Sequence, residues 1–320
     1  MRKYILILTI LTAFLTSCVK DIEFDGAQSE PLLVVNGIQQ VGQPSRLGVE
    51  KSRFFMDSDN DFRVKDVAVD LYVNGTFKES LQVKDSLIYE TTWVWDETIQ
   101  DSHEATLLEY AFNYCEGTYV LCAGDQLRYE VRSSEFEPAT VELVMPETPN
   151  VVSFDTVRVD TLNNLVTFAL VLDDPVGKDF YNLYPRESLS GFTSSDPVFS
   201  DLLDFDIENL TGESNDYYGF GYYNVFSDTY FDGKRYTVSM KKSFWGYAES
   251  ESFVLEVSKV DEHLYRYKKT YEGYQDSNPG SLLGMFTEPV QVYSNVQNGI
   301  GIVAAQSQPL VFVIDLSFNF

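Results

Sequence analysis

The sequence predicts a mainly β protein in which an immunoglobulin-like β-sandwich is followed by a second β-rich domain carrying one short helix. Tyrosine and phenylalanine, which favour strands, occur 21 and 23 times, against 3 tryptophans. Short runs of alternating apolar and polar residues recur along the chain, and turn-forming pairs such as Asn-Gly separate them. With a helical period in only one stretch, these features are typical of antiparallel sheets.

The first 17 residues have the layout of an export signal. Arg2 and Lys3 precede an apolar run that ends at Leu15. This run is too short to cross a bilayer as a helix, which needs about 20 residues. It leads into Thr-Ser-Cys, which resembles a bacterial lipobox. We therefore expect residues 1–17 to be removed and Cys18 to carry a lipid; the alternative is a secretory signal with an incidental cysteine.

Residues 18–30 are polar and acidic and are predicted to form a tether. Asp21, Glu23 and Asp25 follow the cysteine closely and resemble the acidic export tags of surface lipoproteins in Bacteroidota. The expected location is the outer membrane, with the chain exposed at the cell surface.

Residues 31–145 are predicted to form the immunoglobulin-like sandwich. Its expected strands are 32–35, 47–49, 67–73, 77–83, 127–131 and 141–143. Asn36-Gly37 is expected to close the first strand, and Asn74-Gly75 to make a two-residue hairpin turn. Pro146 and Pro149 then interrupt the pattern, so we place the domain boundary after Met145.

Residues 146–320 are predicted to form the β-rich C-terminal domain. Its clearest strands are 168–172, 253–257 and 310–314, the last expected to be buried. One helix is predicted because Leu264, Tyr267, Tyr271 and Tyr274 share one face of a 3.6-residue period. Asp261 is its expected N-cap, and Gly273 lies where it should end.

The charge limits the classes of partner. The formal charge is −26, and removal of Arg2 and Lys3 leaves 21 basic and 49 acidic residues, or −28. Such a surface repels phosphate backbones and anionic lipid head groups, so nucleic acid is not an expected partner. Solubility is the simpler explanation of this charge, and capture of cations is the alternative.

Two cysteines remain after Cys18. In an oxidising compartment Cys115 and Cys122 are predicted first as a disulfide, with a free pair as the alternative. We expect no bound metal there, since the chain has only two histidines and no ligand cluster surrounds the pair.

One aromatic stretch, residues 216–233, is the candidate surface for a ligand or partner. Its candidate residues are Tyr217, Tyr218, Phe220, Tyr222, Tyr223, Phe226 and Tyr230. Their rings could stack on sugars or dock a receptor, since tyrosine is enriched in interfaces. The alternative is a strand pair with packed aromatics. Trp93 and Trp95, two residues apart, are predicted to point the same way. They are expected to belong to the core, and a stacking platform on a sheet face is the alternative.

Alternating carboxylates at Asp57, Asp59 and Asp61 resemble part of a calcium loop. An EF-hand loop would need glycine at Phe62 and glutamate at Ala68, so that motif fails. A solvated acidic loop is the prediction, with a looser oxygen cage as the alternative. No nucleophile elbow, HExxH or phosphate loop is present, and we expect no cofactor and no catalysis.

Taken together, these segments resemble a Bacteroidota lipoprotein family, domain of unknown function 4249 (DUF4249). The matching pieces are the lipobox, 30–37, 69–75, 124–131, 139–146, 228–234 and 288–301. Members of this family are similar in being encoded near TonB-dependent outer-membrane receptors. The resemblance therefore implies an accessory role in uptake, with a receptor as partner and a glycan or other nutrient as ligand, and it supplies no catalytic residues.

Two other hypotheses stay open at this point. One is a structural or adhesion module of the envelope with no small ligand. The other is an extracellular hydrolase, which would need two carboxylates brought together in a cleft.

Overall fold

The structure is a computed structural model, which describes residues 30–54, 57, 59–96, 101–160, 162–163, 165–189, 199–201, 205–207, 224–243, 250–276 and 290–315. Pro31–Phe320 forms one compact unit. The expected lipidation site Cys18 lies outside the described residues, as do Tyr217, Tyr218, Phe220, Tyr222 and Tyr223. Within the described residues no helix has the length and apolar character needed to cross a membrane.

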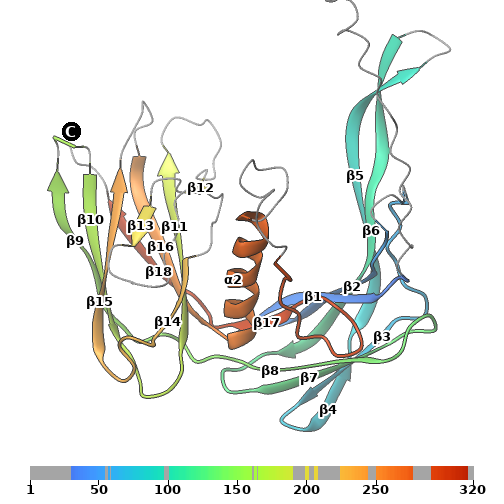
Figure 1. Ribbon diagram of the computed structural model, residues 1–320, viewed down its shortest axis with the longest axis horizontal. Coiled ribbons are helices and arrows are strands. Elements are labelled where there is room, and N and C mark those ends of the chain that lie inside the picture. The colour runs from blue at the N-terminus through green and yellow to red at the C-terminus, as the bar shows by residue number, and fades with distance from the viewer. Residues whose placement is uncertain are drawn as a thin grey trace, which may run out of the picture. The chain divides into compact units, whose positions relative to one another are not determined.

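The chain is mainly β, as predicted (Figure 1). The strands of the first half are β1 (Leu33–Gln40), β2 (Pro44–Lys51), β3 (Ala68–Val73), β4 (Thr76–Ser80), β5 (Gln82–Asp96), β6 (Asp101–Val120), β7 (Gln126–Arg132) and β8 (Ala139–Val144). Those of the second half are β9 (Val151–Asp160), β10 (Leu165–Asp173), β11 (Phe180–Leu189), β12 (Phe199–Asp201), β13 (Phe205–Ile207), β14 (Asn224–Ser227), β15 (Arg235–Ser243), β16 (Ser250–Val260), β17 (Val303–Gln306) and β18 (Leu310–Asp315). Helix α2 spans Glu262–Asp276.

These strands form three sheets. Two have four strands each, in the orders β4-β3-β7-β8 and β13-β15-β10-β9. The third follows the order β12-β11-β16-β17-β1-β2-β6-β5, with β14 also pairing with β11 and β18 with β16. One large sheet thus runs through both halves of the chain.

The first hydrophobic core confirms the predicted sandwich. Apolar side chains of β3, β7 and β8 meet those of β1, β2, β6 and β17 from the large sheet. Strand β7 shows the expected alternation, since Leu127, Tyr129 and Val131 are buried and their neighbours are not. The Tyr129 hydroxyl is satisfied inside the core, because it hydrogen-bonds to Ser45 (2.7 Å) and to the Gln39 side chain (3.1 Å).

The two Asn-Gly pairs behave differently. Asn74 (φ 51°) and Gly75 (φ 76°) are both left-handed and join β3 to β4, as predicted. Asn36-Gly37 does not end its strand, so that prediction is wrong. Gly37 continues β1, because a Cβ there would lie 2.6 Å from the Arg46 carbonyl oxygen and only glycine admits this close approach.

A second core lies between β10 and β15 on one side and β11, β14 and β16 on the other. The predicted alternation holds, since Phe168, Leu170 and Leu172 of β10 are all buried. Phe168 stacks on Phe253 of β16 at 4.5 Å between ring centroids.

The predicted helix is present as α2. Asp261 caps it, because its carboxylate accepts a hydrogen bond from Leu264 N–H (2.8 Å). Leu264 is buried in a third core together with Phe180 and Val260. The predicted end at Gly273 is wrong, since the helix continues to Asp276. Gly273 faces Val290, whose side chain lies 3.5 Å from the position of an added Cβ.

Strand β17 joins the halves of the chain. It runs parallel to β1, with Gly37 opposite Val303, and also meets β16 through Val260 opposite Gln306. Gly301 makes the approach to β1 feasible: its φ is +114°, and a Cβ there would lie 2.3 Å from the Val35 carbonyl oxygen.

The first core contains residues from both sides of the predicted domain boundary after Met145. Val296, Val303 and Ala305, from the predicted C-terminal domain, complete the first core. The last strand also differs from prediction. Val311 (55% exposed) and Val313 (65%) of β18 point outward, because the alternate residues Phe312 and Ile314 pack against the second core.

Candidate functional site

The longest strands of the protein form a two-stranded ribbon. Strands β5 and β6 pair from Gln82–Glu116 to Asp96–Asp101 (Figure 1). Strand β2 accompanies β6 only over its last part, from Asn113 to Val120. We name residues 89–96 and 101–108, which extend past β2 and past residues 59–64, the β5–β6 ribbon. It is the candidate functional site because large apolar side chains are exposed on its described part.

Large apolar side chains of the ribbon are exposed. Trp93 is 71% exposed, Tyr89 57% and Leu107 50%, and neighbouring Leu87 and Ile88 are each near 45%. The prediction that Trp93 belongs to the core is therefore wrong, and its exposure agrees with the alternative of a side chain on an open sheet face. The side chain of Trp95 lies outside the described ones. By the strand register Tyr89 and Trp93 share one face of the ribbon, whereas Leu107, which pairs with Glu90, lies on the other. Exposed aromatic side chains on one face are typical of an interaction surface.

Residues 59–64 buttress the root of the ribbon. Phe62 N–H donates to the Ala111 carbonyl (2.8 Å), and Ala111 N–H donates to the Asn60 carbonyl (3.0 Å). The Asn60 side-chain amide also donates to the Leu108 carbonyl (3.0 Å). The segment thus lies along β6 through one isolated parallel bridge, Asp61 opposite Ala111, next to the place where the ribbon begins.

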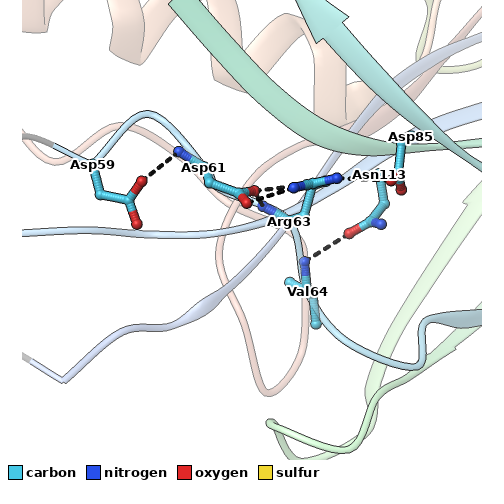
Figure 2. A network of polar contacts seen from close by, with 6 residues as sticks. All are labelled: Asp59, Asp61, Arg63, Val64, Asp85 and Asn113. Carbon is cyan, nitrogen blue, oxygen red and sulfur yellow. Dashed lines mark hydrogen bonds and ion pairs between the residues drawn. The ribbon is translucent and has the colours of Figure 1, made fainter. Parts of the chain in front are cut away.

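The Arg63 side chain and the Val64 backbone connect residues 59–64 to β5 and β6, as Figure 2 shows. Its guanidinium donates to the two carboxylate oxygens of Asp61 (2.8 and 2.7 Å) and to Asp85 of β5 (2.8 Å). One residue on, Val64 N–H donates to the side-chain oxygen of Asn113 in β6 (2.7 Å). The Arg63 guanidinium lowers the pKa of Asp61 to about 2. The Asp61 carboxylate is therefore ionised at neutral pH, and its pair with Arg63 is intact.

The acidic loop has a structural role here. Asp59 accepts a hydrogen bond from Asp61 N–H (2.9 Å), and Asp61 is neutralised by Arg63. Asp57 and Asp59 are exposed, and the loop borders a hollow of about 550 Å³ that is also lined by Arg53. This matches the predicted solvated loop better than an oxygen cage, because the Asp61 carboxylate already pairs with the Arg63 cation.

A second hollow, of about 360 Å³, lies on the outer face of the large sheet. Tyr110, Phe112 and Tyr114 of β6 line it, two residues apart, so their side chains share a face. Phe112 lies over Gly48, and Glu50 accepts hydrogen bonds from the Tyr110 hydroxyl and the Asn36 amide. Partial burial raises the pKa of Glu50. Aromatic faces beside a carboxylate suit a hydroxyl-rich ligand. The alternating aromatics of 110–114 are the signal that the sequence analysis missed.

Two of the predicted aromatic surface residues are described. Phe226 is 1% exposed and packs on Tyr181 in the second core, so its prediction as a surface residue is wrong. Phe226 is buried because β14 pairs with β11 in the large sheet and its side chain packs in the second core. Tyr230 is 57% exposed in the β14–β15 turn.

Cys115 and Cys122 are free thiols, so the predicted disulfide is not present and the alternative of a free pair applies. Cys115 is buried in β6, whereas Cys122 follows the strand and is exposed. Seven residues of extended chain span about 23 Å at about 3.3 Å per residue. A disulfide needs Cα atoms about 4.4–6.8 Å apart, so extended pairing holds the thiols too far apart.

These features define a class: a mainly β protein whose sandwiches share one large sheet and carry an exposed ribbon. The chain belongs to the DUF4249 family, whose model, "Domain of unknown function (DUF4249)", matches residues 19–309. No curated protein matches it. A β-glycosidase from Bacteroides vulgatus is similar over 72% of this chain and 23% of its own, with 11% identity and a TM-score of 0.19. A likeness at this level carries no argument about fold or activity.

Proposed function

We propose that the protein is an outer-membrane lipoprotein, anchored by Cys18 at the cell surface, that serves as a non-enzymatic accessory of a TonB-dependent receptor in nutrient uptake. The proposal rests on the signal-like start of the sequence, on the resemblance described above and on the ribbon. The observation that carries it is the exposure of Tyr89, Trp93 and Leu107 on the β5–β6 ribbon.

The ribbon suits docking for two physical reasons. Among the described strands β5 is the outer one of its sheet, so its edge offers N–H and C=O groups to a partner strand. Its aromatic side chains are the residue types that dominate binding energy, at about 2 kcal/mol or more for a central contact. The Arg63 network holds the root of the ribbon, so less conformational freedom is lost when a partner binds.

The aromatic hollow supports a part in ligand capture. Tyr110, Phe112 and Tyr114 offer ring faces, and Glu50 offers a hydrogen-bond acceptor, to a glycan or another hydroxyl-rich nutrient. In this proposal the ribbon contacts the receptor and the hollow contacts the cargo.

A pull-down of the tagged lipoprotein from its native membrane in mild detergent, followed by mass spectrometry, tests the proposal. Wild type should recover a TonB-dependent receptor in near-equal amount. The double variant Tyr89→Ala/Trp93→Ala should recover about 30-fold less, the equivalent of about 2 kcal/mol. Leu162→Ala removes a side chain that is 93% exposed on another turn, and Tyr114→Ala alters the hollow, so both should recover the receptor normally.

Two results would count against the proposal in different ways. Unchanged recovery with the double variant would place the docking surface elsewhere. A wild-type sample that retains its lipid but brings down another envelope protein or polymer, and no receptor, would favour the adhesion hypothesis.

A further inference from the structure

The β5–β6 ribbon exposes large apolar side chains on both of its faces. In an antiparallel ladder, directly opposite residues share a face, and so does every second residue of one strand. Tyr89 and Trp93 therefore lie on one face, which we call the tryptophan face. Leu107, which stands opposite Glu90, lies on the other face together with Ile88 at the base of the ribbon, and we call this the leucine face. All four apolar side chains are exposed.

The described strands leave both faces and both edges of the ribbon accessible. Strand β2 pairs with β6 only from Asn113 onward, and the bridge to residues 59–64 is at Ala111. Along residues 89–93 and 104–108 the described strands pair only with each other. A two-stranded ribbon is marginally stable in water by itself, so a partner that covers both faces would also stabilise it.

The area of the ribbon favours a partner that contacts more than one face. Residues 89–96 span about 26 Å at about 3.3 Å per residue, and two strands about 4.8 Å apart are about 10 Å wide. One face thus offers about 260 Å², whereas a stable interface buries about 800 Å² on each partner. Two faces and two edges of similar size offer about 1,000 Å² in all, which is enough.

The charge of the ribbon indicates which kind of partner fits it. Its two strands contain four acidic residues and no lysine or arginine; the acids are Glu90, Asp96, Asp101 and Glu104. Glu104 stands opposite Trp93, and Glu90 stands opposite Leu107, so each face combines a carboxylate with a large apolar side chain. A second copy of this acidic chain, or an anionic lipid surface, would repel the ribbon, whereas lysine and arginine side chains would attract it.

We propose that the β5–β6 ribbon inserts into a cleft of its partner protein, with apolar walls against both faces and lysine or arginine side chains at the rim. The inference rests on the proposed function, because it takes the receptor as that partner, and it adds how the receptor holds the ribbon. Insertion requires that both faces contribute to binding. It also requires that the carboxylates of both faces meet cations.

Receptor recovery in the membrane pull-down tests the two faces separately. Tyr89→Thr/Trp93→Thr changes the tryptophan face, and Ile88→Thr/Leu107→Thr changes the leucine face. Threonine keeps the preference for a strand while it removes the apolar contact. Each double variant should recover about tenfold less receptor than wild type. The matched control is Val152→Thr/Val157→Thr, which changes two exposed valines of β9 and should recover the receptor normally.

Charge reversal gives a second readout at exposed positions where folding is not at stake. Glu90→Lys and Glu104→Lys should each lower receptor recovery by about tenfold in low salt, because each places a cation against the cationic rim. The loss should shrink as salt is added, since screening shortens the reach of the repulsion to about 10 Å at about 0.1 M. Glu137→Lys makes the same change of charge at an exposed position outside the ribbon and should recover the receptor normally.

The outcomes separate this inference from the proposed function. Loss of recovery from only one face would overturn insertion and leave a receptor that docks on a single surface. Normal recovery from both faces, with the receptor still present in the wild-type sample, would also overturn it. Equal loss with Glu137→Lys would indicate diffuse attraction and overturn the cationic rim. A wild-type sample without any receptor would instead overturn the proposed function, and this inference with it.

Discussion

At the scale of single residues, the two carboxylate oxygens of Asp261 have opposite effects on the stability of the fold. Its Oδ1 caps α2 by accepting a hydrogen bond from Leu264 N–H. Its Oδ2 is buried and has no hydrogen-bond partner within the described residues. Burial raises the pKa of this carboxyl from 3.8 to about 7. The cap therefore favours the protonated side chain, and ionisation near neutral pH works against the folded state.

This conflict gives a prediction for the pH dependence of stability. Because the folded pKa lies above the unfolded value, stability is lost as pH rises between about 4 and 7. Wild type should lose about 2–3 kcal/mol between pH 5 and 8 through this group, at about 1.4 kcal/mol per pH unit. Asp261→Asn keeps a good N-cap and should lack this component.

Urea unfolding of both proteins across this pH range measures the effect. Nearby Glu262 and His263 titrate in both proteins, so the difference between the two curves isolates Asp261. Parallel curves would show that the carboxyl ionises normally in the folded state.

At the scale of elements, the β5–β6 ribbon depends on the segment beside its root. A two-stranded ribbon is marginally stable alone in water, so added contacts decide where it frays. Asn60, Phe62 and Val64 supply backbone and side-chain hydrogen bonds to β6, and Arg63 adds the pair with Asp85. Phe62 also packs on Tyr110 of β6, with 4.6 Å between ring centroids, where residues 59–64 meet β6.

Removing Arg63 should therefore loosen this joint without unfolding the protein. Arg63→Ala should speed amide hydrogen exchange in residues 59–64 and 108–113 by about tenfold, since two charge-assisted contacts are lost from a site that is 35% exposed. Arg158→Ala is the control, because this arginine is 70% exposed and makes one contact with Asp160. Equal exchange in both variants would mean that the backbone bonds alone hold the joint.

At the scale of the whole molecule, β17 makes one folding unit of two sandwiches. Val303 and Ala305 enter the first core, while Ile302 and Ala304 enter the core beneath α2. These residues are more than 250 positions away from β1 in sequence. The first sandwich is therefore incomplete until the C-terminal segment has been made and has docked.

A fragment comparison tests this dependence. Residues 31–145 alone should lack a cooperative thermal transition, because β1 has lost its parallel neighbour and the core has lost Val296, Val303 and Ala305. The same fragment with residues 290–307 joined by a flexible linker should regain the transition. A cooperative transition in the shorter fragment would instead support an independent domain ending at Met145.

Local patterns let the sequence by itself determine the β class, the Asn74-Gly75 hairpin and the capped helix after Asp261. The physical reason is that alternation, left-handed turn residues and capping act over a few neighbouring positions. Sequence also predicted the DUF4249 family, because many short segments match in order.

Only the tertiary structure decided what each pattern packs against. Phe226 and Trp93 are both strand aromatics, yet one is buried and the other exposed, since β14 has a second sheet over it and the ribbon has none. Gly37 was predicted to close its strand but admits the close approach of Arg46 in the adjacent β2, and Gly301 admits the close approach of β1. The aspartates at 174, 228 and 232 become a cluster only when two turns more than 50 residues apart meet. Contacts of this kind depend on the path of the whole chain, so no local sequence pattern predicts them.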